Sequence, residues 1–583
     1  MLLRTRWILF APVIALLAQD ASVIRVTTRM VEVNVIVRDL KGPVAGLAKD
    51  DFTIFDKGTR QKIAFFSANS IHHTQPPPAD SKSPAKTVFT NRPMMNADAA
   101  QSATVVLLDG LNTQFQDQLY AKKQVVKFLS QIRTDDHVAV YTLGNGLKVL
   151  HDFSSDPRSL LNAVAKFNGQ NLPFVEISEP DPANTGDPDL DTRLNDLFQA
   201  MADQSVMNRV RLTSAALISI ANHVSHLPGR KTLVWVSSSF PFSLGACGGE
   251  NPTDWNQTFS GDGSKSGCMQ FGPPPITTTP SGGKRAASGG GGGTGGLNAP
   301  GPSAFMQPSR ENLIFDVEIR KAMQALNAAN VVIDPVDARG LTSMPKMFLA
   351  TMASRPRNSA PPPFQDTSPT GISVMEIVAE DTGGRAFYNT NDIQGAIRKA
   401  IDDSDVTYTL GFYPDSKSLD SRFHPLKVEV AKRGLEVRYR KGYTASPDSL
   451  MTEDDREQMV KDALWSPLAA TGITIAATMN RIDQPKSVRI TLILDPAELQ
   501  FTPADGKRKA EVVIAFEQRS ADGHDLGRTE QVAPITLDED RYQSRQPLTL
   551  TKTLTPADGL SEVRVAVFDH QSAKIGSLTI PIK

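Results

Sequence analysis

Apolar and polar positions follow three different patterns along this chain of 583 residues. Residues 31–37 (VEVNVIV) and 52–66 alternate apolar with polar side chains, which is the period of half-buried strands, and turn residues between them predict hairpins. From residue 104 to residue 403, short apolar runs alternate with longer amphipathic stretches. After Asp405 the alternation typical of strands returns and continues to the C-terminal part of the chain.

The middle region has the pattern of an α/β domain. Its apolar runs at residues 104–108 (TVVLL) and 231–236 (KTLVWV) lack polar alternation and are typical of strands buried on both faces. Further strands are predicted at residues 138–143, 147–151 and 331–336. The main predicted helices cover residues 117–132, 190–227, 310–329, 371–381 and 392–403. Because strands and helices alternate, we expect a parallel sheet covered by helices on both faces.

The chain exceeds the length that one hydrophobic core usually serves, and the patterns divide it into several domains. The α/β domain is predicted at residues 103–405, and it contains a Gly- and Pro-rich insertion at 240–309 that we expect to be disordered. The other predicted segments are a linker at 70–102, a β-sandwich formed by 19–69 together with 406–445, and a C-terminal β-sandwich at 446–583.

The first 18 residues have the layout of a secretory signal peptide. Arg4 and Arg6 precede an apolar run that ends in small residues near Ala18 and is too short to span a bilayer. We therefore expect a secreted or periplasmic protein with no transmembrane span after cleavage. The two cysteines of the chain, Cys247 and Cys268, lie in one polar loop, and in an exported protein such a pair predicts a disulfide.

The charge of the chain argues against binding to nucleic acid or to an anionic membrane, and its motifs argue against the common hydrolases and nucleotide-binding enzymes. Lys and Arg total 62 and Asp and Glu total 63, which gives a net charge of -1, so neither nucleic acid nor an anionic membrane is an expected partner. The sequence contains no H-E-x-x-H, G-x-S-x-G or G-x-x-x-x-G-K-[ST] motif. His223 and His226 lie one helical turn apart, but without a third ligand nearby we expect them at a solvent-facing or helix-end position.

Polar residues follow the two most apolar strands of the α/β region. Asp109, Asn112 and Thr113 come directly after the first strand, and Ser237 and Ser238 follow the second. Ligands of open α/β sheets bind beyond the carboxyl ends of the strands, so these side chains are candidate ligand-binding residues. The alternative is a local role, in which Asp109 caps the following turn and its neighbours bond the backbone.

Several longer phrases resemble a known family. The order of elements, the buried strand ending at Asp109, and KTLVWVSSSFP resemble a von Willebrand factor A domain. The phrases VRDLKGPVAGLAKDDFTIFDKG, LPGRKTLVWVSSSFP, VVIDPVDARGL, EDTGGRAFYNTNDI and TYTLGFYP resemble the VWFA-related family named from acidobacteria, over residues 23–443. The resemblance implies a Rossmann-like sheet in an extracytoplasmic protein that binds a protein or another ligand.

The same resemblance implies a metal-ion-dependent adhesion site for Mg²⁺ or Mn²⁺ at the top of the sheet. Such sites use D-x-S-x-S, a threonine from a second loop and an aspartate from a third. Asp109 and Thr113 match the ends of the first motif, and Thr213 matches the second-loop threonine. However, Leu111 replaces a serine, and serines replace the third-loop aspartate. Because hard cations need several oxygen ligands, the expectation is a degenerate site without a cofactor, with a metal on Asp109 and Thr113 as the alternative.

These observations predict a noncatalytic, adhesion-type protein. Its α/β domain is expected to recognise a protein or an envelope polymer through the loops at the carboxyl edge of the sheet. Two alternatives stay open, namely an extracytoplasmic hydrolase whose catalytic residues form no linear motif, and a structural envelope scaffold. A recognition protein should bind a partner that is lost on loop mutation, and a hydrolase should turn over ester or peptide libraries. A scaffold should do neither.

Overall fold

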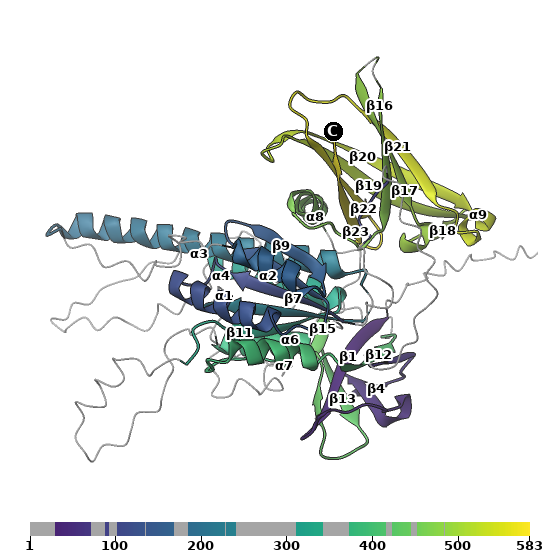
Figure 1. Ribbon diagram of the computed structural model, residues 1–583. Helices are drawn as coiled ribbons and strands as arrows, with labels where there is room; N and C mark the ends of the chain where they lie inside the picture. Colours follow the sequence, from purple (N-terminus) through teal and green to yellow (C-terminus); the bar gives the residue numbers. More distant parts are fainter. Residues whose placement is uncertain are drawn as a thin grey trace, which may run out of the picture.

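The computed structural model describes residues 30–70, 88–92, 102–133, 136–167, 185–227, 229–240, 310–341, 372–414, 423–444, 452–482, 484 and 486–582. They form an α/β unit and two units built from antiparallel sheets (Figure 1). The predicted signal peptide, the insertion at 241–309 and both cysteines lie outside the described residues. Among the described helices, none combines the length and the hydropathy that crossing a membrane requires.

The α/β unit is built on a mixed sheet of five strands in the order β11-β10-β7-β8-β9. Its strands are β7 (Ser102–Asp109), β8 (Val138–Leu143), β9 (Leu147–Ser154), β10 (Arg230–Ser237) and β11 (Val331–Asp337). The first four in spatial order are parallel, but β9 runs antiparallel to β8. The prediction of an all-parallel sheet was therefore wrong at this edge. Only residues 144–146 join β8 to β9, and a parallel crossover needs a dozen residues or more.

Helices cover both faces of this sheet. On one face lie α1 (Phe115–Leu129), α2 (Pro157–Ala165) and α7 (Ile393–Asp402), and on the other lie α3 (Pro188–Val224), α4 (Arg310–Ala328) and α6 (Ile372–Thr382). The fully buried Trp235 side chain lies in the core on the α3 side. With 37 residues, α3 is about 55 Å long, and its N-terminal half extends past the carboxyl edge of the sheet (Figure 1).

Strands from both sides of the α/β unit pair with each other in two sheets. One sheet has the order β14-β1-β12-β5 with β2 beside β1, and the other has the order β15-β13-β3-β4. The strands before the α/β unit are β1 (Val31–Asp39), β2 (Gly42–Pro43), β3 (Phe52–Asp56), β4 (Thr59–Gln61) and β5 (Phe65–Ser70). The strands after it are β12 (Val406–Phe412), β13 (Phe423–Val430), β14 (Glu436–Arg438) and β15 (Gly442–Thr444). The two sheets enclose one apolar core that includes Phe52, Tyr408 and Phe412.

The C-terminal unit consists of helix α8 (Glu453–Trp465) and two further sheets, β21-β17-β16-β6 and β18-β19-β22-β23 with β20 beside β19. Its later strands are β16 (Ile475–Ile482), β17 (Ser487–Leu494), β18 (Thr502–Ala504), β19 (Lys507–Arg519), β20 (Asp525–Asp538), β21 (Leu548–Leu554), β22 (Glu562–Asp569) and β23 (Ile575–Pro581).

Strand β6 (Val88–Thr90) corrects the prediction that residues 70–102 are only a linker. It pairs antiparallel with β16, far along the chain. The buried Asn91 extends this attachment, because its Nδ2 donates to the carbonyls of Ala470 and Ile473, and its Oδ1 accepts from Ile475 N. A strand of three residues is too short to show a periodic pattern in the sequence.

The end of α3 contacts the segment that follows α8. Thr471 Oγ1 donates to the carbonyl of His223, and His223 Nδ1 lies 2.8 Å from the carbonyl of Ala469. His223 is the second-last residue of α3 and is buried between two units, so the predicted helix-end position was confirmed and the solvent-facing alternative was wrong. This burial was missed from the sequence because the residues that cover His223, 469–471, are remote in the chain. His226 Nδ1 faces Glu498 across 3.8 Å.

Buried charges connect the N-terminal sandwich to the α/β sheet. The Asp403 carboxylate accepts hydrogen bonds from both Arg38 and Arg438. Within the α/β unit, the buried Lys231 on β10 donates to the carbonyl of Ala329 at 2.9 Å, and burial lowers its pKa to about 8. Buried, directional contacts of this kind specify how two surfaces fit together.

Asp334, buried in β11, predicts a pH dependence of stability. Its Oδ1 accepts from Arg385 N at 2.6 Å, and burial raises its pKa to about 6, although the charge of Arg230 opposes this shift. The folded protein therefore takes up this proton at a higher pH than the unfolded chain does. Above about pH 6 the ionised carboxylate destabilises the fold. This penalty disappears as the pH falls toward 4. Asp334→Asn should be more stable than wild type at pH 7.5, by up to about 3 kcal/mol.

Thermal unfolding between pH 4.5 and pH 7.5 checks this expectation. The difference between Asp334→Asn and wild type should shrink as the pH falls, whereas the exposed control Asp558→Asn should follow wild type throughout. A difference that is the same at pH 4.5 and pH 7.5 would show that protonation of Asp334 is not its cause.

Candidate functional site

The six residues predicted at the carboxyl edge of the sheet lie together. Asp109 ends β7 and Asn112 and Thr113 follow it, Ser237 ends β10 and Ser238 follows it, and Thr213 comes from α3. All six are buried and joined by hydrogen bonds. The chain turns sharply after Asp109 because the backbone N–H groups of residues 110 and 111 both donate to the carbonyl of Leu143 on β8.

The Asp109 carboxylate is 2 % exposed and accepts four hydrogen bonds from the protein. Its Oδ1 accepts from Asn112 N at 2.9 Å. Its Oδ2 accepts from Asn112 Nδ2 at 2.8 Å, Trp235 Nε1 at 2.9 Å and Ser237 Oγ at 3.1 Å. Burial raises the pKa of Asp109, and these hydrogen bonds oppose the shift. Asp109 thus caps its own turn and also ties β7 to β10.

Arg209 contributes a cation that the sequence analysis missed. Its Nε donates to Asn112 Oδ1 at 3.0 Å, and Asn112 Nδ2 donates in turn to Thr213 Oγ1 at 3.0 Å. Burial lowers the pKa of Arg209, and the negative charge of Asp109 opposes this shift. A signal was present in the sequence, because Arg209 precedes Thr213 by four residues and so lies on the same face of the helix.

Thr113 and the serines hold the two loops together. Thr113 Oγ1 accepts from Ser238 N at 3.1 Å and lies 3.4 Å from Ser237 Oγ. Ser238 Oγ accepts from Gln114 N at 3.3 Å. Nearby, burial raises the pKa of Asp117 in the first turn of α1, and a hydrogen bond with Ser238 opposes the shift. The hydroxyl groups expected to bind a ligand therefore make hydrogen bonds within the protein.

This donor set does not fit a divalent cation. Mg²⁺ requires near-octahedral oxygen coordination, usually including carboxylates. Here the carboxylate of Asp109 is surrounded by N–H and O–H donors, the Leu111 side chain is buried in the core on the α3 side, and the Arg209 guanidinium brings a positive charge. Within the part of the chain that the structure describes, no group of three or more His, Cys, Asp or Glu residues could hold a metal ion.

The surface around the buried network is partly apolar. Phe115 and Leu119 on α1 are 43 % and 49 % exposed, and Leu341 after β11 is 64 % exposed. Beside them, Arg339 forms a bidentate ion pair with Asp337, with Nε to Oδ1 at 3.0 Å and Nη2 to Oδ2 at 2.8 Å. The carboxyl edge therefore presents apolar side chains next to an ion-paired guanidinium.

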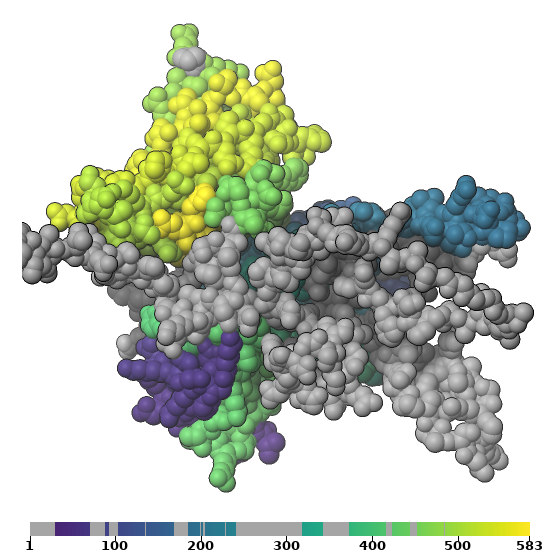
Figure 2. Space-filling view, turned by 180° about the vertical axis from the view of Figure 1, so that it is seen from behind, coloured from purple at the N-terminus to yellow at the C-terminus, as the bar shows by residue number. Residues whose placement is uncertain are grey.

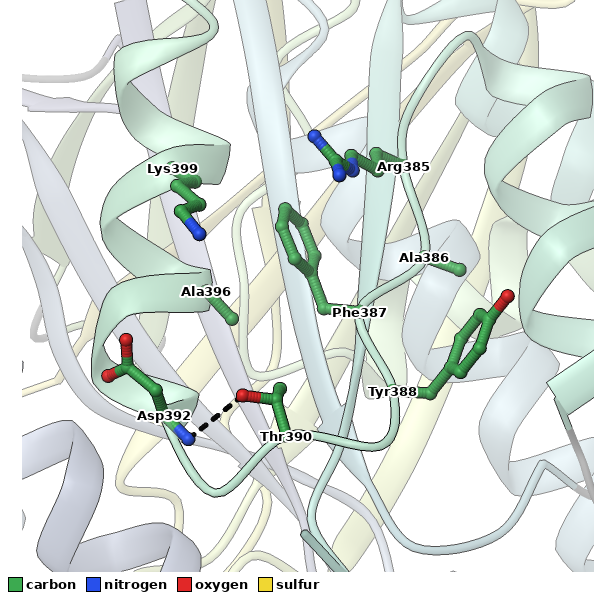
Figure 3. Close-up of a pocket in the computed structure, with 8 residues that line it drawn as sticks. All are labelled: Arg385, Ala386, Phe387, Tyr388, Thr390, Asp392, Ala396 and Lys399. Atoms are coloured by element: carbon green, nitrogen blue, oxygen red, sulfur yellow. Dashed lines mark hydrogen bonds between the residues drawn. The ribbon is translucent and has the colours of Figure 1, made fainter. Parts of the chain in front are cut away.

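A shallow pocket of about 370 Å³ lies apart from this network (Figure 3). It is lined by the segment that follows α6 and by α7, namely Arg385, Ala386, Phe387, Tyr388, Thr390, Asp392, Ala396 and Lys399. Thr390 Oγ1 accepts from Asp392 N at 3.1 Å, and the Arg385 guanidinium lies 5.4 Å from the centre of the Phe387 ring. The pocket contains none of the predicted site residues.

Comparisons with known proteins assign no family. No known family profile and no curated protein matches the sequence. Among solved structures, an aerotolerance-related membrane protein from Bacteroides fragilis is 11% identical with a TM-score of 0.23, covering 52% of this chain and 98% of that chain. The PilB minor pilin from Streptococcus sanguinis is 10% identical with a TM-score of 0.23, covering 52% and 62%. The pilus adhesin SpaC from Lactobacillus rhamnosus GG is 9% identical with a TM-score of 0.22, covering 82% and 57%. Likenesses this low assign neither fold nor function to this chain.

Proposed function

We propose that this chain is a secreted or periplasmic, noncatalytic recognition protein with a von Willebrand factor A-type domain. Its partner is a protein or an envelope polymer, and binding needs no metal. The order of strands and helices in the α/β unit supports the proposal, as do the six polar residues gathered at the carboxyl edge, where sheets of this kind bind ligands. The leader-like N-terminus supports export.

One observation carries the metal-free mechanism, namely the hydrogen bond from Arg209 to Asn112 beside the buried Asp109. In a metal-dependent site, the cation balances the aspartate and leaves a position for the partner. Here a guanidinium of the chain itself balances Asp109, and the loops are held in place by internal hydrogen bonds. Recognition then depends on the surface they support, which presents Phe115, Leu119 and Leu341.

A titration with Mg²⁺ and Mn²⁺ tests this mechanism. Calorimetry of the protein without its signal sequence should show no binding, and the melting temperature should not change. Arg209→Ala should lower the free energy of unfolding by about 1–3 kcal/mol, because it leaves the buried Asn112 Oδ1 without its donor. The neighbouring, exposed control Arg211→Ala should change it by about 0.5 kcal/mol or less. Metal binding to wild type that Asp109→Ala abolishes would refute the metal-free mechanism.

Recognition itself is tested on immobilised protein exposed to fractionated envelope material in EDTA. A retained component should be lost from the double variant Leu119→Ser/Leu341→Ser by about tenfold in affinity or more. Val149→Ser, whose side chain is 38 % exposed on β9, is the matched control and should bind like wild type. Three outcomes would contradict the proposal. Retention could require Mg²⁺, the double variant could retain the component as well as wild type does, or the protein could turn over ester or peptide libraries.

A further inference from the structure

The N-terminal half of α3 projects away from the rest of the molecule. Among the side chains of α3 that the structure describes, the first buried one is Ser205, and the N-terminal half of the helix extends beyond the carboxyl edge of the sheet (Figure 1). In the view from behind, the blue end of α3 protrudes from the side of the molecule (Figure 2). Because this half of the helix packs on no core in the described part of the protein, its exposed side chains indicate the kind of partner that could bind it.

Five apolar side chains form a continuous line on this projecting half. We call them the α3 stripe, and its members are Leu190, Leu194, Leu197, Phe198 and Met201. Their spacing of three and four residues places them within a sector of about 100° on the helix surface. Leu190 is 45 % exposed, Leu197 54 % and Met201 61 %. An aligned, exposed apolar row of this kind is typical of a helix that packs against a partner.

The stripe is bordered by acidic residues. Residues 187–198 contain four aspartates and one basic residue, Arg193, which gives a net charge of -3. Asp189 and Asp196 are exposed on one side of the stripe, with the exposed Arg193 between them and the stripe, and Asp191 lies on the other side in partial contact with solvent. The projecting half of α3 is therefore both apolar and strongly negative, although the whole chain is nearly neutral.

This charge selects among the possible occupants of the stripe. A second copy would place two surfaces of charge -3 against each other, and an anionic membrane would repel the aspartates. A helix with an apolar face and flanking Lys or Arg side chains matches both features, because its apolar face packs on the stripe while its cations pair with the bordering carboxylates.

We propose that the α3 stripe is a docking surface for a basic amphipathic helix of another protein. The helix lies along the projecting half of α3, with its apolar residues on Leu190, Leu197 and Met201 and its cations near Asp189 and Asp196. This surface is separate from the carboxyl edge, and the proposal does not require the edge to bind anything.

The test uses the full protein without its signal sequence and a fluorescent synthetic peptide of about five helical turns. The peptide has Leu at spacings of three and four residues and Lys at the other positions. Fluorescence anisotropy should show binding to wild type, about tenfold weaker binding to Leu197→Ser/Met201→Ser, and unchanged binding to Val206→Ser. Val206 is a matched control, because it is 40 % exposed on the same helix but lies outside the stripe.

Three further measurements can overturn the proposal. A scrambled Lys/Leu peptide that binds equally well would show that charge alone is recognised, and equal binding after Asp189→Asn/Asp196→Asn would show that the carboxylates play no part. Sedimentation that finds a dimer, dissociated by Leu197→Ser/Met201→Ser, would identify a second copy as the occupant. Strong protection of Met201 from oxidation in wild type, lost when residues 241–309 are deleted, would identify the chain itself as the occupant. The carboxyl-edge variant Leu119→Ser/Leu341→Ser should bind the peptide like wild type, so failure here leaves the proposed function untouched.

Discussion

Asp109→Leu should lower the free energy of unfolding of the α/β unit by about 4 kcal/mol, because it removes the fully buried carboxylate at the centre of a hydrogen-bond network. Three donors would lose their acceptor, namely two N–H groups of Asn112 and the Trp235 indole N–H, whereas the Ser237 hydroxyl keeps the Ser239 carbonyl at 2.7 Å. Each buried donor left unpaired costs about 1–3 kcal/mol, and leucine recovers only part of this through apolar burial. Arg209 would also lose the negative charge of Asp109, which favours its charged form.

Urea unfolding monitored by tryptophan fluorescence measures this effect, since Trp235 is buried against the substituted side chain. Asp117→Leu is the matched control, because Asp117 lies at the same edge but is only half-buried, and it should cost less than about 1 kcal/mol. An Asp109→Leu variant as stable as wild type would mean that the hydrogen bonds of this network contribute nothing to the fold.

Arg564→Leu should detach α8 from the C-terminal unit at a cost of about 3–5 kcal/mol. Arg564 Nε donates to the Leu464 carbonyl at 3.0 Å, and its Nη2 donates to the carbonyls of Ala463, Ser466 and Leu468. These carbonyls lie at or just after the C-terminus of α8, where a cation also balances the helix dipole. Burial lowers the pKa of Arg564 to about 10, so the group remains charged at neutral pH.

Limited proteolysis between residues 452 and 470 measures detachment of α8, and urea unfolding measures the loss of stability. The exposed control Arg489→Leu, on the same unit, should change neither by a measurable amount. If Arg564→Leu resists the protease as wild type does, the carbonyl contacts of Arg564 are not what holds α8 in place.

The middle of the fold could be predicted from the sequence because its apolar runs are long and its helices periodic. Five of the six polar residues meet at one edge because the ends of neighbouring parallel strands must do so, and Thr213, which lies on α3, was found only through the family resemblance. Arg209 could not be found in the same way, because it acts from the side of a helix of 37 residues whose rotation depends on packing. For Asp109, a capping role and a place at the binding edge were alternative predictions from the sequence. In the structure Asp109 has both, because it caps its own turn and also accepts a hydrogen bond from Ser237 at the edge.

Other features depend on partners that are remote in the chain. His223 lies at a helix end as predicted, but its burial depends on residues 469–471, and β6 shows no periodicity over three residues. The antiparallel edge strand β9 was detectable in principle, because a connection of three residues cannot make a parallel crossover.

The pairing of distant strands imposes an order on biosynthesis. The sheet of the α/β unit forms from one continuous stretch of chain. In contrast, β1 can pair only after β12 has been synthesised, and β6 only after β16 has been synthesised. A nascent chain emerging from the ribosome therefore exposes the edges of β1, β3 and β5 throughout synthesis of the α/β unit, and unpaired edges of this kind are aggregation-prone. The α/β unit can condense first, the N-terminal sandwich closes once residue 444 is available, and β6 stays unpaired until β16 arrives. A polypeptide truncated after residue 444 would still carry that orphan strand.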